Sequence, residues 1–126
     1  MTDIIDCGVF VRSATYTGPG TIDGHIIKSN GSDEISGYFT GAGNAVKILL
    51  GFRPLEITII DETDLLKWEW AWGLANPILM TGSTGVLTSD TSGDVTIVDG
   101  GAGNYWLVLA ATLAATGKNI VFEIDG

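Results

Sequence analysis

Residues 45–72 read AVKILLGFRPLEITIIDETDLLKWEWAW, and the spacing of the apolar residues in this stretch decides the fold class. In three runs, 45–50, 55–60 and 66–72, apolar side chains recur at every second position. This is the period of a β-strand that buries one face. A proline-containing break and a polar turn separate the runs, so the pattern predicts three strands that form one antiparallel meander.

Alternation also predicts which side chains each strand buries. The expected buried sets are Val46, Ile48 and Leu50 in the first strand, Leu55, Ile57 and Ile59 in the second, and Leu66, Trp68, Trp70 and Trp72 in the third. Asp61-Glu62-Thr63-Asp64 is expected to form the solvated turn between the second and third strands.

The rest of the chain after Gly73 continues as short apolar runs between glycine-rich turns. It predicts strands at 86–88, 95–98, 104–110 and 119–124, with a turn or a single helical turn at 111–117. Short strands at this spacing are typical of a sandwich or a barrel. We therefore expect residues 1–126 to form a single all-β domain, an antiparallel β-sandwich or barrel-like fold with 37–126 as its strand-rich core.

Residues 1–36 are weakly patterned, and they form either an extended N-terminal arm or further strands. Strands are expected at 4–11 and 22–28, with a loop at 13–20. Asn30-Gly31 is a favourable hairpin dipeptide, because both residues tolerate positive φ.

Composition excludes several classes of partner. The chain has 126 residues with 15 acidic and 6 basic side chains, a net charge of −9, so it cannot neutralise a run of phosphates and is not expected to bind nucleic acid. The longest apolar stretch, Tyr105–Ala115, is too short to span a bilayer, so no membrane association is expected. The lone Cys7 and the acidic N-terminus favour synthesis in a reducing cytoplasm.

Reactive residues are few, and the sequence predicts no enzyme. His25 is the single histidine and has no nucleophile motif near it, so no catalytic residues are expected. Glu56 and Glu69 fit outward-facing strand carboxylates better than a glycosidase pair. No cofactor and no metal site are expected, although the acidic turns 61–64 and 90–94 leave calcium binding open.

The row of Trp68, Trp70 and Trp72 has three alternative interpretations. The indoles stand about 6.7 Å apart on one strand face. They build the core, or they form a contact with another subunit or partner, or they stack on sugar rings. Phe52 and Trp106 are the other candidates for contact.

Several motifs resemble small virion proteins of tailed bacteriophages. They are the glycine turn 37–44, the apolar run that ends in Gly51-Phe52-Arg53-Pro54, the run 57–64 that ends in an Asp-x-Thr-Asp turn, the Trp68-Glu69-Trp70 strand, and the closing segment 115–122. The resemblance extends over about half of the chain, and its motifs are those of turns and strands.

The resemblance implies a structural protein of the virion. Its preferred form is a head decoration (cement) protein, made in the host cytoplasm, that binds the capsid exterior and stabilises contacts between major capsid proteins. It further implies self-association as a homotrimer or another cyclic oligomer. The alternative is a tail-associated or fibre-associated module that binds host-surface glycan through its indoles.

Overall fold

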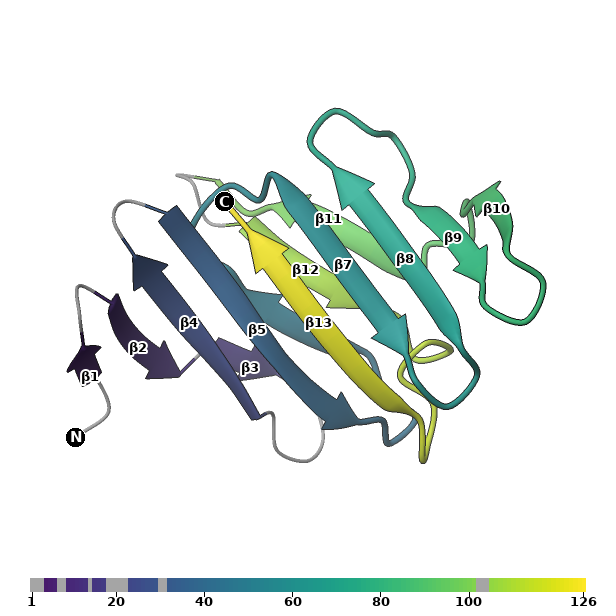
Figure 1. Ribbon diagram of the computed structural model, residues 1–126, viewed down its shortest axis with the longest axis horizontal. Coiled ribbons are helices and arrows are strands. Elements are labelled where there is room, and N and C mark those ends of the chain that lie inside the picture. Colours follow the sequence, from purple (N-terminus) through teal and green to yellow (C-terminus); the bar gives the residue numbers. More distant parts are fainter. Residues whose placement is uncertain (1–3, 7–8, 14, 18–22, 30–31, 102–104) are drawn as a thin grey trace.

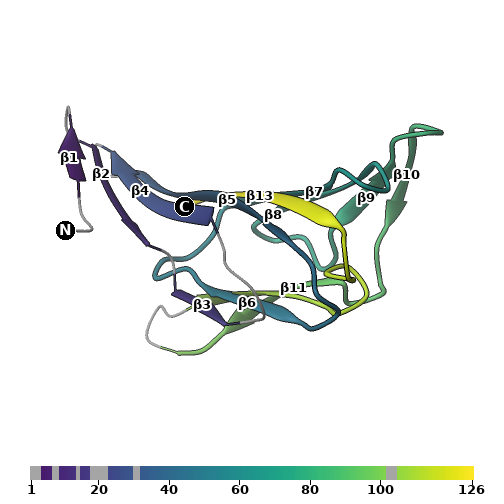
Figure 2. The same cartoon turned by 90° about the horizontal axis from the view of Figure 1, so that it is seen from below.

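The computed structural model describes residues 4–6, 9–13, 15–17, 23–29, 32–101 and 105–126. Its strands form two antiparallel sheets, one with nine strands and one with four (Figure 1). Seen from the side, the two sheets are the layers of a sandwich (Figure 2). No helix occurs in the described ranges, so the expected all-β antiparallel sandwich is confirmed.

The large sheet carries the strand that comes last in the chain near its centre. Its order is β1 (Ile4–Asp6), β2 (Val9–Ser13), β4 (Asp23–Ser29), β5 (Ser32–Thr40), β13 (Asn119–Asp125), β7 (Glu56–Asp61), β8 (Leu66–Ala71), β9 (Ile78–Thr81) and β10 (Val86–Ser89). β13 pairs with β5 on one side and with β7 on the other.

The small sheet has the order β11 (Val95–Asp99), β12 (Tyr105–Leu109), β6 (Val46–Leu49) and β3 (Thr15–Thr17). It lies under the middle of the large sheet, and both ends of the large sheet extend past it (Figure 2). The β9–β10 hairpin is one of these ends, so it stands outside the sandwich.

The core fills the space between the two sheets. From the large sheet it takes alternate residues such as Ile57 and Ile59 of β7, and the small sheet contributes Leu107 and Leu109 of β12. The predicted burial of Val46, Ile48 and Leu50 is confirmed, and Ile120, Phe122 and Ile124 of β13 are buried as well. Burying one face of each strand supplies the apolar area that stabilises the domain.

The predicted three-stranded meander is wrong. β7 and β8 do pair as an antiparallel hairpin, but β6 lies in the small sheet between β12 and β3. The segment that contains Pro54 carries the chain from one sheet to the other. Alternation specifies which side chains share a face, but it does not specify which sheet a strand joins.

The N-terminal expectations are corrected in part. The described residues before position 36 lie in strands, and 4–11 is divided between β1 and β2, which pair with each other. β3 occupies part of the expected loop 13–20. β4 and β5 pair with Ser29 opposite Ser32, while the Asn30-Gly31 turn itself lies outside the described residues.

Two further differences concern the middle of the chain. β9 was not expected, because Ile78–Thr81 is a short run without a clear period. Leu55 is 42% exposed, contrary to the prediction, because β7 begins one residue later at Glu56.

Candidate functional site

Two of the three indoles in the tryptophan row belong to the core. Trp68 is 3% exposed and Trp70 is 9% exposed. Trp68 donates its indole N–H to Oδ2 of Asp90 over 2.7 Å, and Trp70 donates to the carbonyl oxygen of Leu74 over 3.0 Å. Since both rings are largely enclosed and both donors are satisfied, neither indole stands on an outward contact face of the protein, and Trp70 keeps only a small exposed part.

Trp72 lies outside the strand and is 48% exposed. β8 ends at Ala71, and the Trp72 backbone N–H donates to the carbonyl oxygen of Leu55. Its ring stands edge-on to Trp70 and to Tyr105, with centroids 6.1 and 6.0 Å apart. The Arg53 guanidinium carbon lies 4.7 Å from the ring centroid, which is within cation–π range.

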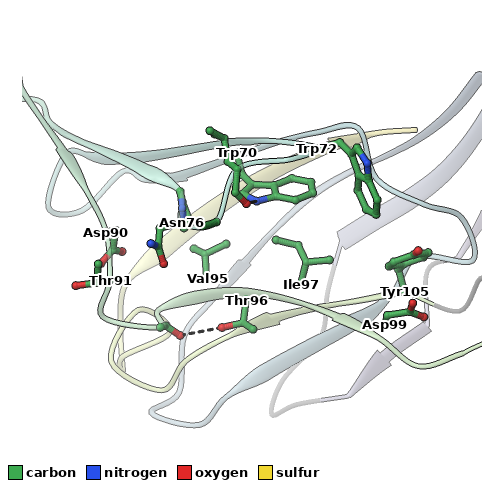
Figure 3. Close-up of a pocket in the computed structure, with 14 residues that line it drawn as sticks. Trp70, Trp72, Asn76, Asp90, Thr91, Val95, Thr96, Ile97, Asp99 and Tyr105 are labelled. Atoms are coloured by element: carbon green, nitrogen blue, oxygen red, sulfur yellow. Dashed lines mark hydrogen bonds between the residues drawn. The ribbon is translucent and has the colours of Figure 1, made fainter.

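A cleft of about 380 Å³ opens beside Trp72, between β8 and its following loop on one side and β11 on the other (Figure 3). Trp70, Trp72 and Tyr105 provide its aromatic surface. Its polar groups are the side chains of Asn76, Asp90, Thr91, Thr96 and Asp99.

The two carboxylates of this cleft already serve the chain's own turns. Asp90 accepts the N–H groups of Ser92 and Trp68, and Asp99 accepts the N–H of Gly101. Burial opposes the charge on Asp90, but the hydrogen bonds from Ser92 and Trp68 outweigh it and hold the pKa of Asp90 below its usual value. Asp90 is therefore a structural anion.

The remaining contact candidates lie elsewhere. Phe52 is 8% exposed and belongs to the core cluster. Trp106 is half-buried on the outer face of the small sheet, where it lines a shallow hollow of about 380 Å³ together with Lys47, Val98 and Val108. The register places Trp106 opposite Val98, and Val108 opposite Lys47. Trp72 and Trp106 are thus the two candidate aromatic residues that remain accessible.

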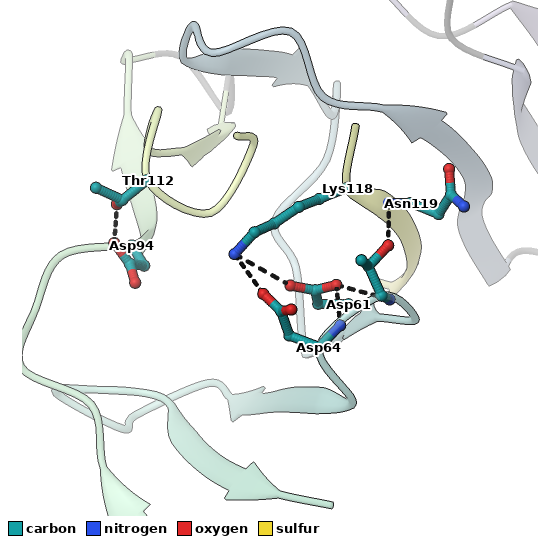
Figure 4. Close-up of polar contacts among 7 residues, drawn as sticks. Asp61, Asp64, Asp94, Thr112, Lys118 and Asn119 are labelled. Atoms are coloured by element: carbon teal, nitrogen blue, oxygen red, sulfur yellow. Dashed lines mark hydrogen bonds and ion pairs between the residues drawn. The ribbon is translucent and has the colours of Figure 1, made fainter. Parts of the chain in front are cut away.

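The acidic turn 61–64 forms ion pairs with the side chain of Lys118 (Figure 4). Asp61 is 1% exposed, and its Oδ1 accepts the backbone N–H groups of Thr63 and Asp64. The Lys118 ammonium lies 2.5 Å from Oδ2 of Asp64 and 3.8 Å from Oδ2 of Asp61. The expectation of a solvated turn is wrong for Asp61, because Asp61 is the last residue of β7 and lies on the same buried face as Ile57 and Ile59.

The second acidic turn, 90–94, is also tied to neighbouring residues. Asp90 is bonded as described above, and Asp94 accepts the Thr112 hydroxyl over 2.6 Å (Figure 4). Within the part of the chain that the structure describes, no three His, Cys, Asp or Glu side chains are grouped as a metal site. In the same part, no helix is long and apolar enough to cross a membrane.

The Glu56 and Glu69 carboxylates lie on the outer face of the large sheet, on paired strands. Glu56 is opposite Ala71, and Glu69 is opposite Thr58, so the two are offset along the sheet. Glu69 forms an ion pair of 2.7 Å with Lys67. His25 lies in β4, and Cys7 lies outside the described residues.

Comparison with known proteins identifies no relative of this chain. No family model, no curated protein and no solved structure matches this chain.

Proposed function

We propose that this protein is a structural component of a tailed-bacteriophage virion, a head decoration protein that binds major capsid proteins on the capsid exterior. The motifs quoted above support the class of protein, and the β-sandwich is compatible with it. The observation that carries the proposal is the hollow around Trp106. A large aromatic side chain and two valines lie there on the outward face of a sheet.

The Trp106 surface has the composition of a binding hot spot. Half-buried tryptophan is well held before binding, so its contact area is gained at low entropic cost. Lys47 at its edge is one of 6 basic residues in a chain of net charge −9, and it offers a partner carboxylate a local positive group. Many copies on one shell would turn a modest single affinity into strong collective attachment.

Binding to undecorated phage heads tests this function. Wild-type protein is expected to bind the heads and to raise their resistance to heat and to chelator. Trp106→Ala is expected to weaken binding by about tenfold or more, the scale of a hot-spot residue. Val98→Lys changes the same surface at a side chain that is 43% exposed, so it separates binding from core packing.

Tyr38→Ala is the matched control, because Tyr38 is 57% exposed on the large sheet and distant in the fold from the small sheet's outer face. It is expected to bind heads like the wild type. If the wild-type protein neither binds heads nor protects them, the proposed function is wrong.

The cleft beside Trp72 supports a second candidate, a tail-associated or fibre-associated module that binds glycan. Its aromatic wall and its hydrogen-bonding oxygens are the two features that sugar rings require, and its volume is in the range of small-ligand pockets. On this alternative, cell-wall or capsule sugars shift the tryptophan fluorescence, Trp72→Ala abolishes the shift, and Trp106→Ala retains it.

A further inference from the structure

The edge of the large sheet at β10 is open. Among the described residues, β10 pairs with β9 alone, so one side of its backbone faces away from the sheet. The hairpin also stands outside the sandwich, where the small sheet does not cover it (Figure 2). An open edge presents unpaired N–H and C=O groups and is a template for another strand.

Apart from its short length of four residues, this edge lacks the usual protective devices. Proteins protect open edges with charged side chains, proline or a bulge. The register of β9 and β10 is continuous over four pairs, so no bulge interrupts it. Residues 70–89 contain no Asp, Glu, Lys or Arg, although the chain has 21 such residues in 126 (15 acidic and 6 basic).

The side chains of β10 are apolar where they are most accessible. Leu87 is 64% exposed, which is the largest fraction among the bulky hydrophobic residues described, and Val86 is 53% exposed. Leu65 in the neighbouring β7–β8 turn is 60% exposed, and its carbonyl oxygen accepts the N–H of Gly82 in the β9–β10 turn. Leu65, Val86 and Leu87 thus mark one end of the sheet with exposed apolar groups.

The distribution of charge indicates which molecule pairs with the β10 edge. Two copies with a net charge of −9 repel each other over most of their surfaces, and the outer face of the large sheet carries Glu34, Asp125 and Glu56 opposite one another in a single row. A charge-free edge is the place where two identical acidic chains can meet with the least repulsion. A basic partner would gain nothing from this edge.

We propose that a second copy of this chain pairs with β10, so that two β10 strands lie antiparallel about a twofold axis centred on Leu87. Residues directly opposite in an antiparallel pair point to the same face. The two sheets can continue with matching faces only if even-numbered residues pair with even-numbered residues and odd with odd. Placing the axis at Leu87 satisfies this condition, and it brings Leu87 of one copy opposite Leu87 of the other. Val86 then lies opposite Thr88 of the other copy.

This arrangement gives a dimer, or an assembly with an even number of copies, in place of a homotrimer. A strand that pairs with its own copy makes an isologous contact, which closes after two subunits. The contact does not involve the Trp106 surface, so it does not depend on the proposed attachment to the capsid.

Native mass spectrometry and sedimentation over a range of concentrations test the pairing. Wild-type protein is expected to be dimeric. Leu87→Lys is expected to weaken self-association by about tenfold or more, because it removes the apolar contact between the two copies of Leu87 and brings two like charges together. Leu55→Lys is the matched control, since Leu55 is also an exposed leucine but lies outside the hairpin. It is expected to remain dimeric.

A cysteine at the dyad tests the register. In a Cys7→Ser background, Leu87→Cys is expected to form a disulfide-linked dimer under mild oxidation, because each residue on the axis faces its own copy at disulfide distance. Val98→Cys, exposed on the small sheet, is expected to remain uncrosslinked. Added salt is expected to strengthen the dimer, because it screens the repulsion between acidic copies.

The proposal is overturned if the wild type is monomeric at every concentration, or if an assembly persists unchanged in Leu87→Lys. Head binding distinguishes this inference from the proposed function. A monomeric Leu87→Lys that still binds heads supports both, whereas a Leu87-dependent dimer that never binds heads supports the pairing and refutes the capsid role.

Discussion

The Trp68 indole N–H donates to Oδ2 of Asp90 over 2.7 Å, and both residues are buried. Trp68 belongs to β8 of the large sheet, while Asp90 begins the turn that leads into β11 of the small sheet. Oδ1 of the same carboxylate accepts the N–H of Ser92. One side chain therefore joins the two layers and shapes the connection between them.

Asp90→Ala is expected to destabilise the domain by about 1–3 kcal/mol, because it leaves a buried indole donor without an acceptor. Urea unfolding followed by tryptophan fluorescence measures the loss. Asp99→Ala is the control, since Asp99 caps the N–H of Gly101 in an exposed turn and no buried donor depends on it. Equal losses in the two variants would contradict the role assigned to Asp90.

The pH dependence of stability is expected to carry the signature of Asp90. Its pKa is lowered below the usual 3.8, because the hydrogen bonds outweigh the effect of burial. A lowered pKa gives stability that is present above the unfolded-state value and is lost as pH falls through the folded-state value. Asp90→Asn keeps an oxygen acceptor but cannot titrate. The wild type's advantage over Asp90→Asn should therefore shrink below about pH 4.

Glu34 is expected to behave in the opposite way. Burial, followed by repulsion from Asp125 and Glu123, raises the pKa of Glu34 above its usual 4.5. The ionised form thus destabilises the fold at neutral pH, and protonation relieves the cost. Glu34→Gln is expected to raise stability at neutral pH by about 0.2–1 kcal/mol, with the gain vanishing as pH falls through the raised pKa. Glu62→Gln, in an exposed turn, should show no such gain.

Removing the Lys118 ammonium is expected to destabilise the acidic turn. Lys118→Met leaves the carboxylate of Asp61, which is 1% exposed, without a nearby cation, and we expect a loss of about 1–3 kcal/mol. Lys47→Met removes an exposed lysine and should be close to neutral. Chemical denaturation of the two variants makes the comparison, and a near-neutral Lys118→Met would show that Asp61 does not need this cation.

The same ion pair sets an alkaline limit. The hydrogen bond to Asp64 raises the pKa of Lys118 above its usual 10.5, with further contributions from the charges of Asp64 and Asp61. A raised lysine pKa gives stability that is complete below the unfolded-state value and is lost as pH rises through the folded-state value. The difference between the wild type and Lys118→Met should therefore persist at neutral pH and disappear in strong alkali.

The local pattern of the sequence was a good guide to strands and faces between residues 46 and 124. Alternation identified β7, β8 and β13 and most of their buried residues, because a strand's own side chains carry that signal. The assignment of β6 to the small sheet was not predictable, because the choice between pairing with β7 or with β12 depends on residues distant in sequence.

In the candidate site, too, the sequence pattern predicted the strand but not the surroundings of individual side chains. The sequence placed Trp72 in line with Trp68 and Trp70, but β8 ends at Ala71 and leaves Trp72 in the bend before Gly73, whose φ is 100°. Asp61 looked like an ordinary turn acid. Its side chain continues the buried face of Ile57 and Ile59 at the end of β7, and the fold brings its cation, Lys118, from a distant part of the sequence.

The central position of β13 also constrains the order in which the protein can be assembled during synthesis. β5 and β7 meet only through β13, and β13 follows every other strand in the chain. Until β13 is available, β1–β2–β4–β5 and β7–β8–β9–β10 are separate groups of strands, each with an unsatisfied inner edge. Completion of the large sheet is then a single late event that depends on contacts of long sequence separation, and such contacts form slowly. Exposure of the nascent chain to self-pairing is therefore greatest just before its last strand emerges.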